Sequence, residues 1–152
     1  VSVDGTLTDG YCCINKKWKK GDKVEIHFDM EPRTVKANNN VEADRGRVAV
    51  ERGPLVYCAE WPDNKGFNIL HVLINQHPKF QVVSAPDLLN GIDEIKTDAQ
   101  VLSYGNDGCV QAQNVGLTLI PYYAWANRGE GYMNVWMAQD VSAINLSSPE
   151  TK

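Results

Sequence analysis

Short segments in which apolar and polar residues alternate with a period of two run through most of this 152-residue chain. In the clearest of them, residues 23–30, every even position is apolar and every odd position is polar. This alternating segment predicts a strand with one buried face. Residues 55–59 are instead apolar at every position, which is typical of a strand buried on both faces. Because a period of two fits strands and not helices, the pattern restricts the chain to β architectures.

More short runs follow at similar spacing, bounded by Gly, Pro, Asn and Asp. They are residues 47–51, 69–74, 80–83, 91–96, 101–104, 115–120 and 133–137. Many short strands separated by turn residues are typical of all-β sandwiches and barrels. We therefore expect an all-β fold, an antiparallel β-sandwich of the jelly-roll-like type with little helix. The one helical turn that we expect covers residues 86–90, with Ser84 as its cap.

Composition and charge narrow the classes of partner. A hydrophobic content of 43% and a charged content of 22% suit one globular domain, alone or with a piece of another. The net charge of −4 argues against a nucleic-acid partner, because neutralising phosphates requires a basic surface. No apolar run approaches the ~20 residues that span a bilayer, so no membrane partner is expected. The lysines around Trp18 are interpreted as a solvated turn, with an anionic-ligand patch as the alternative.

The sequence contains no motif that identifies metal ligands or catalytic residues. The cysteines have no zinc-site spacing, and we expect buried, unpaired thiols, with a disulfide or a metal as alternatives: Cys12, Cys13, Cys58 and Cys109. The histidines also lack ligand spacing. Acid/base chemistry of the paired-carboxylate type needs two carboxylates ~5–10 Å apart, and no local motif singles out a pair among Glu51, Glu60, Asp63, Glu94 and Glu130. We assign no catalytic residue, no metal ligand and no cofactor to this chain.

The richest stretch is residues 121–136, in which aromatic rings alternate with Asn, Arg and Gly. Rings beside planar polar groups are what a sugar-binding surface uses, and they indicate Tyr123, Trp125 and Arg128 as candidate ligand-binding residues. The favoured interpretation is structural. Rings in β-rich domains are more often core residues, with Arg and Asn tying a corner together through backbone hydrogen bonds.

Three blocks of the sequence resemble glycoside hydrolase family 127, in the order in which the family has them. The first resembles the end of the family's middle β-domain and comprises Gly10, Tyr11, Ile14, Trp18, residues 21–24 and Met30. The second, residues 46–58 followed by Asp63 and Asn64, resembles the entry into the final domain. The third and most specific comprises residues 119–125, residues 127–129, Met133, Val135 and Trp136.

The resemblance implies a C-terminal part of a multi-domain exo-glycosidase, similar to β-L-arabinofuranosidases, whose α/α-barrel catalytic domain precedes this chain. Residues 1–36 are then the end of the middle β-domain and contribute strands to it. Residues 37–140 are the C-terminal β-sandwich domain, and residues 141–152 are a flexible tail. The family's nucleophile is a cysteine held on zinc by further cysteines and a glutamate in the barrel. That motif has no counterpart here, so the four cysteines inherit no role and zinc is implied only for the catalytic domain.

We therefore predict a non-catalytic accessory β-sandwich, not an enzyme by itself, that supports the catalytic barrel or an oligomer interface. The alternative is a carbohydrate-binding module that recognises plant arabinose-containing glycans. The expected partner is the α/α-barrel domain of the parent chain, with a second copy and a carbohydrate as further candidates. When the chain is separated from the catalytic barrel, the apolar surface that docks on that barrel is exposed, and this predicts self-association of the chain. The sequence does not fix the compartment, and the resemblance implies a bacterial parent that is periplasmic or secreted.

Overall fold

The structure, a computed structural model, describes residues 6–146. Every regular element in this range is a strand or a short 3-10 turn, so the prediction of an all-β fold with little helix is confirmed. The strands are β1 Thr6–Thr8, β2 Tyr11–Cys13, β3 Pro32–Val35, β4 Arg47–Arg52, β5 Leu55–Glu60, β6 Val72–Ile74, β7 Gln81–Ala85, β8 Ile92–Tyr104, β9 Val110–Pro121, β10 Met133–Asn134 and β11 Met137–Ala138. The 3-10 turns are η1 Glu42–Asp44, η2 Trp61–Asp63, η3 Ile69–His71, η4 Tyr122–Ala124 and η5 Val141–Ala143.

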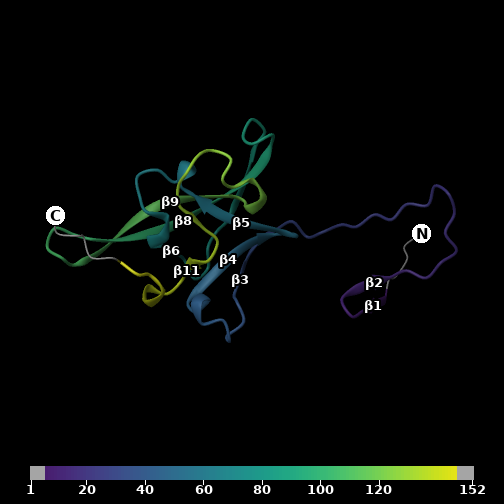
Figure 1. Ribbon diagram of the computed structural model, residues 1–152, viewed down its shortest axis with the longest axis horizontal. Helices are drawn as coiled ribbons and strands as arrows, with labels where there is room; N and C mark the ends of the chain where they lie inside the picture. The colour runs from purple at the N-terminus through teal and green to yellow at the C-terminus, as the bar shows by residue number, and fades with distance from the viewer. Residues whose placement is uncertain (1–5, 147–152) are drawn as a thin grey trace.

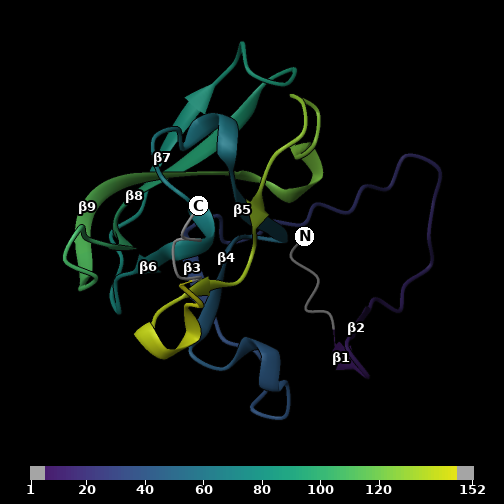
Figure 2. The same cartoon turned by 60° about the vertical axis from the view of Figure 1, so that its left-hand side comes forward.

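Six strands close into a barrel in the order β5-β9-β8-β6-β11-β4, and β4 pairs back onto β5 (Figures 1 and 2). All these pairings are antiparallel except that of β6 with β11, which is parallel. Three more strands extend the sheet: β3 pairs with β4, β7 with β8, and β10 with β5. The expected jelly-roll-like sandwich is therefore corrected to a closed barrel with extra strands. The closure depends on β11 reaching both β4 and β6, a long-range pairing that local periodicity does not encode.

Alternate side chains of the barrel strands fill the interior, as the two-residue repeat requires. Tyr57 and Ala59 of β5 point inward, and so do Leu117 and Leu119 of β9. The rest of the buried interior is Val48, Val50, Ile69, Val72, Ile74, Ile95, Ala99, Val101 and Met137. Every barrel strand contributes at least one of these residues, so the core belongs to the closed sheet as a whole.

A second, smaller core lies on the outside of the barrel. Between the inward-facing Tyr57 and Ala59, Cys58 points outward and packs with Ile120, Ile92 and Ala124. The turn between β7 and β8 and the stretch after η4 cover this cluster with Leu88, Leu89, Met133 and Val135. The prediction that residues 55–59 form a strand buried on both faces is therefore confirmed for residues 57–59, where one face meets the barrel core and the other this outer cluster, but not for Val56, which is 37% exposed.

Several predicted segments differ in detail. Residues 91–96 and 101–104 belong to one long strand, β8, and residues 133–137 split into β10 and β11. The predicted helical turn at residues 86–90 is instead the turn that joins β7 to β8. Leu89 and Asn90 there have φ values of 49° and 65°, in the left-handed region that stops a helix from propagating.

The alternating segment, residues 23–30, forms no strand in this structure, although its pattern is the clearest in the sequence. It leaves the barrel as an extended trace before β3 (Figure 1). Val24, Ile26 and Phe28 are 54%, 71% and 59% exposed. A half-buried strand needs a sheet to lie on, and the described residues supply none at this place.

The cysteine prediction was partly wrong. All four thiols are free, but only Cys58 is buried. Cys12 and Cys13 lie on the separate β1–β2 hairpin, and Cys109 lies at the turn between β8 and β9, where no core covers them.

The predicted domain boundaries 1–36, 37–140 and 141–152 stay predictions. Residues 141–146 include η5, which Asp140 caps, and residues 147–152 of the predicted flexible tail lie outside the described residues.

Candidate functional site

The barrel carries a buried ion-pair network at the corner where β5 ends and the chain returns after β9. Arg128 donates from Nη2 to Glu60 Oε2 at 2.5 Å and to Asp63 Oδ2 at 2.5 Å, and from Nη1 to Asp63 Oδ1 at 2.6 Å. Glu60 is the last residue of β5 and is only 2% exposed. A buried carboxylate requires a charged partner, and this guanidinium serves two carboxylates at once.

Two further contacts fasten the same corner. The backbone N–H of Ala126 donates to Glu60 Oε1 at 2.8 Å. Buried Asn64 donates from Nδ2 to the carbonyls of Glu60 and Thr118 at 2.8 and 2.9 Å, and its Oδ1 accepts from the Thr118 N–H at 2.9 Å. Glu60 therefore holds the loop after η4, while Asn64 ties the turn η2 to strand β9.

The charges at this corner shift two pKa values. Hydrogen bonding to Asp63 and then to Glu60 raises the pKa of the Arg128 guanidinium against the effect of burial, so Arg128 stays a cation. Burial raises the pKa of the Cys58 thiol to about 12, and the nearby charges of Glu60 and Asp63 add to that shift. Cys58 is therefore a neutral thiol at ordinary pH and a poor nucleophile.

Ala126 is held in a strained conformation by this network, with a φ of 62°. The left-handed region costs a residue with a Cβ about 1–2 kcal/mol, and glycine does not bear that cost. We expect Ala126→Gly to raise the free energy of unfolding by about 0.5–1 kcal/mol, because the strain removed exceeds the extra entropy of the unfolded glycine. Urea denaturation measures this value.

Ala124, two residues earlier, is the matched control. It is buried and its φ is not positive. Ala124→Gly should therefore destabilise the chain, by about 1 kcal/mol. If both glycine variants destabilised the chain, the conformation of Ala126 would not be a strained one.

The candidate residues Tyr123, Trp125 and Arg128 lie in this one loop, but the structure gives them different surroundings. Arg128 is bound to the two carboxylates and does not face solvent as a ligand-binding group. Tyr123 is 65% exposed, and Trp125 stacks against Tyr122 with ring centroids 6.1 Å apart. The expectation that these rings fill the core was therefore wrong. Strand β9 ends at Pro121, and the rings after it lie outside the closed barrel.

The predicted hydrogen bonds from Arg and Asn side chains to the backbone of this corner are present in part. Asn127 donates from Nδ2 to the carbonyls of Ala124 and Trp125 at 3.0 and 3.2 Å, as a backbone tie requires. Arg128, in contrast, binds carboxylates and not backbone. Sequence reasoning named Glu60 and Asp63 only among several acids. The available signal was a glutamate directly after an all-apolar strand, since a charge at the end of a buried strand needs a partner.

Tyr123 also borders a shallow pocket of about 360 Å³ with Arg52, Tyr57 and Asp93. Arg52 Nη1 donates to Asp93 Oδ2 at 3.0 Å, and the Tyr57 hydroxyl donates to the Asp93 carbonyl at 3.1 Å. Burial raises the pKa of the Tyr57 hydroxyl, so it remains a neutral donor. These bonds fasten the start of β8 to β4 and β5 at this pocket.

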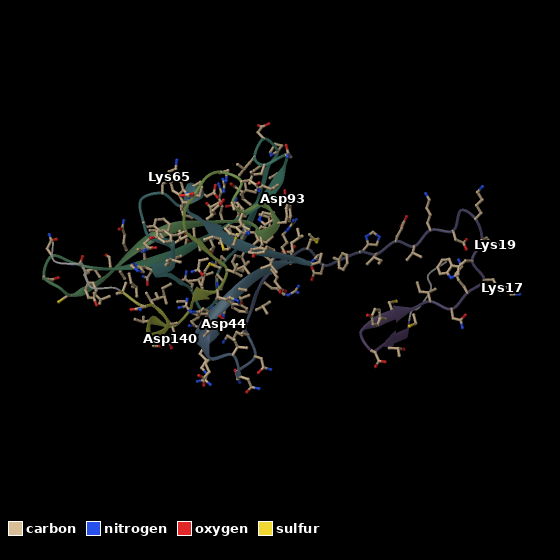
Figure 3. All side chains as sticks on the ribbon, viewed as in Figure 1. Lys17, Lys19, Asp44, Lys65, Asp93 and Asp140 are labelled. Carbon is tan, nitrogen blue, oxygen red and sulfur yellow. The ribbon has the colours of Figure 1, made fainter. Side chains whose placement is uncertain are left out.

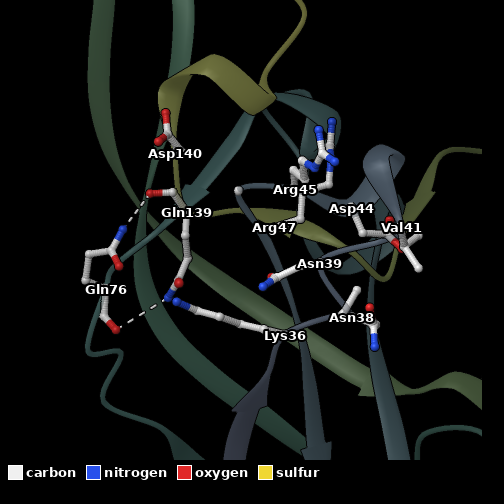
Figure 4. A pocket seen from close by; sticks show the side chains of 12 residues that line it. Lys36, Asn38, Asn39, Val41, Asp44, Arg45, Arg47, Gln76, Gln139 and Asp140 are labelled. Carbon is white, nitrogen blue, oxygen red and sulfur yellow. Dashed lines mark hydrogen bonds between the residues drawn. The ribbon is translucent and has the colours of Figure 1, made fainter.

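A more polar pocket of about 360 Å³ lies between the loop after β3 and the end of β11 (Figure 4). Gln76 and Gln139 bridge its wall: Gln76 Nε2 donates to the Gln139 carbonyl at 2.8 Å, and Gln139 Nε2 donates to the carbonyls of Asn75 and Gln76. Arg47 donates to the carbonyls of Trp136 and Ala143. These contacts fix the last segment of the described chain to the barrel.

Within residues 6–146, no group of three or more His, Cys, Asp or Glu side chains is arranged to hold a metal ion. The donor set that zinc requires is thus not assembled in the part of the chain that the structure describes. No helix in that part is long and apolar enough to cross a membrane.

The fold and the ion-paired corner define a small all-β barrel domain. Its sequence matches the glycoside hydrolase family 127 C-terminal domain over residues 32–138, and the chain belongs to this family. The resemblance that the three sequence blocks indicated is thereby confirmed.

Individual relatives agree with the family assignment. The non-reducing end β-L-arabinofuranosidase of Bifidobacterium longum subsp. longum is 37% identical, with a match that covers 87% of this chain and 22% of that protein. A solved family 127 β-arabinofuranosidase is similar with 62% identity and a TM-score of 0.81, over 95% of this chain and 23% of the other. The family 127 β-L-arabinofuranosidase of Geobacillus stearothermophilus T6 gives 36% identity and a TM-score of 0.73, over 87% and 22%. This chain thus spans about a fifth of the length of these relatives.

Proposed function

We propose that this chain is a non-catalytic accessory barrel of a larger glycoside hydrolase similar to the β-L-arabinofuranosidases, and that it supports the catalytic domain. The observation that carries the proposal is the match of residues 32–138 to the family's C-terminal domain, within relatives of which this chain covers about a fifth. The parent protein is then the hydrolase, and the α/α-barrel domain implied by the family resemblance is the partner that the accessory barrel contacts.

The chemistry of the corner supports a structural role. The two carboxylates that the fold brings together, Glu60 and Asp63, are both bound by Arg128. A glycosidase acid must release a proton to the leaving group, and its partner must attack or activate water. Carboxylates neutralised by a permanent cation inside a packed corner stabilise a loop and are poorly suited to either task.

The carbohydrate-binding alternative is not proposed. Of its three candidate residues, Arg128 is engaged within the protein. The relatives are named for arabinofuranosidase activity and not for a binding module.

Hydrolysis of an aryl β-L-arabinofuranoside tests the proposal on three proteins: this chain, the full-length protein, and the full-length protein lacking residues 32–152. We expect turnover by the full-length protein and none by the chain. We also expect a lower melting temperature and lost activity in the truncated protein, because a supporting barrel stabilises the domain that it covers. Turnover by the chain that disappears in Glu60→Gln would overturn the non-catalytic role. Unchanged stability and activity after the truncation would overturn the supporting role.

A further inference from the structure

Strands β8 and β9 form a long hairpin, and one edge of that hairpin is uncovered over most of its length. The two strands pair without interruption from Ile95 and Leu119 to Tyr104 and Val110. On its other side, β9 pairs with β5 only at residues 119–121. Figures 1 and 3 show the turn of this hairpin at the opposite end of the molecule from the β1–β2 hairpin. The first part of β9 therefore has one neighbouring strand and one open edge.

The side chain of Asn64 shows which residues of β9 direct their backbone groups to the open edge. Asn64 Nδ2 donates to the Thr118 carbonyl, and Asn64 Oδ1 accepts from the Thr118 N–H, both at 2.9 Å. Asn64 thus occupies the place of a neighbouring strand beside Thr118. In an antiparallel pair, every second residue directs its N–H and C=O to the same edge. Because the register of β8 with β9 contains no bulge, the even-numbered residues before Thr118 share its direction.

Four residues of this edge have backbone groups without a partner in the part of the chain that the structure describes: Val110, Ala112, Asn114 and Gly116. All four are exposed. Proteins usually protect such an edge with charged side chains, proline or a bulge. Residues 109–118 contain no charged residue and no proline. The open edge, residues 110–116, is therefore available for pairing with another strand.

Gly116 is a second, independent indication that another backbone approaches this edge. Its φ is not positive, so the backbone conformation does not require glycine. A Cβ added to Gly116 would have no atom within 4 Å, so packing within the chain does not require glycine either. A glycine inside a strand weakens that strand and often marks a close approach of another backbone or a ligand. Close approach is the explanation that remains for Gly116.

We propose that the open edge pairs antiparallel with the same edge of a second copy of this chain, about a two-fold axis at Gln113. This register pairs Val110 with Gly116 of the partner subunit and Ala112 with Asn114 of the partner subunit. Every unpaired residue of both edges thereby gains a partner, whereas an axis one residue earlier or later leaves one of them unpaired. The association uses polar backbone groups and not the apolar docking surface expected from the sequence, and it does not depend on the accessory role.

The chemistry and the length of the edge favour a second copy over another polypeptide. A two-fold axis brings each residue near its own copy, so a charged edge would repel itself and an uncharged edge does not. The lengths also match: with the axis at Gln113, the strand of the second copy begins opposite Gly116, just before it would reach Asn64. Directly opposite residues have their side chains on the same face, so Val110 fills the space beside Gly116 that no Cβ occupies.

Charge variants at Gln113 test the proposal by sedimentation equilibrium, in the 152-residue chain and in the full-length protein. Gln113→Lys and Gln113→Glu each place two like charges opposite each other at the axis, and each should weaken the dimer about fivefold. An equimolar mixture of the two should recover it, because opposite charges then face each other. Gln111→Lys is the matched control. It adds the same charge opposite Val115 of the partner subunit and should have a smaller effect. All three side chains lie at exposed positions, so the variants should keep the fold.

Hydrogen exchange of the unmodified protein reports on the edge itself. The amides of the four unpaired residues should exchange rapidly in dilute protein and at least about tenfold more slowly in concentrated protein, because ladder hydrogen bonds protect amides. The amides of residues 111, 113 and 115, which face β8, should be protected at both concentrations.

Three outcomes would overturn the proposal. The first is a monomer with rapid exchange of the four amides at every concentration. The second is a dimer that Gln113→Lys and Gln113→Glu leave unchanged, which would assign the association to another surface. The third is slow exchange of the four amides in the full-length protein at every dilution, which would show that another part of that protein covers the edge.

Discussion

Replacing Arg128 with methionine is expected to lower the free energy of unfolding of this chain by about 3–5 kcal/mol. The replacement leaves Glu60 and Asp63 close together in a buried corner without the cation that both of them bind. It also removes one of the two contacts between Glu60 and the loop after η4, so that only the bond from the Ala126 N–H is left. Urea denaturation followed by tryptophan fluorescence measures the change, with a constant slope showing that the same folded state is compared.

The exposed ion pair of Arg33 with Glu51, at 2.9 Å, provides the control. Arg33→Met removes the same cation from a solvent-exposed pair and should cost less than about 1 kcal/mol. Glu60→Gln combined with Arg128→Met should cost less than the sum of the single changes, because the two residues act in one network. An Arg128→Met variant as stable as the Arg33→Met variant would show that the corner is not organised by its charges.

The sequence predicted the positions of most strands, but it did not predict that the strands close into a barrel. Short apolar runs bounded by turn residues located β4, β5 and β7, and in β4 the residues Val48 and Val50, two positions apart, both face the barrel interior. Closure depends on β11, two residues long, pairing with β4 on one side and β6 on the other. Nothing within a two-residue strand specifies partners that are tens of residues away, so the choice between a sandwich and a barrel was beyond local pattern.

The candidate site was also predictable only in its local part and not in its long-range contacts. The loop after β9 stood out because of its rings, and Arg128 was found there, but its partners were not. Asp63 and Glu60 lie 65 and 68 residues earlier in the chain, and only the pairing of β5 with β9 and β10 brings them to Arg128. The rings were misjudged for a related reason. Aromatic content indicates burial only when the strand that carries it continues into the core, and β9 ends at Pro121.

Leu119→Ala is expected to have the second large effect, a loss of about 2–5 kcal/mol in the free energy of unfolding. Leu119 is fully buried in β9, opposite Ala59 of β5 and Ile95 of β8. Because neighbours on both sides belong to the closed sheet, the wall cannot collapse inward to fill the cavity without breaking ladder hydrogen bonds. The value should therefore fall in the upper half of this range.

Leu70→Ala removes the same atoms from a side chain that is 40% exposed, and it keeps the hydrogen bond from the Leu70 N–H to Asn68 Oδ1. It should cost less than about 1 kcal/mol. The contrast between two identical substitutions measures how much stability the barrel interior supplies beyond simple loss of apolar surface. If Leu119→Ala cost no more than Leu70→Ala, β9 would not be packed as a central wall of a closed barrel, and the six-strand ring would have to be abandoned in favour of an open sheet.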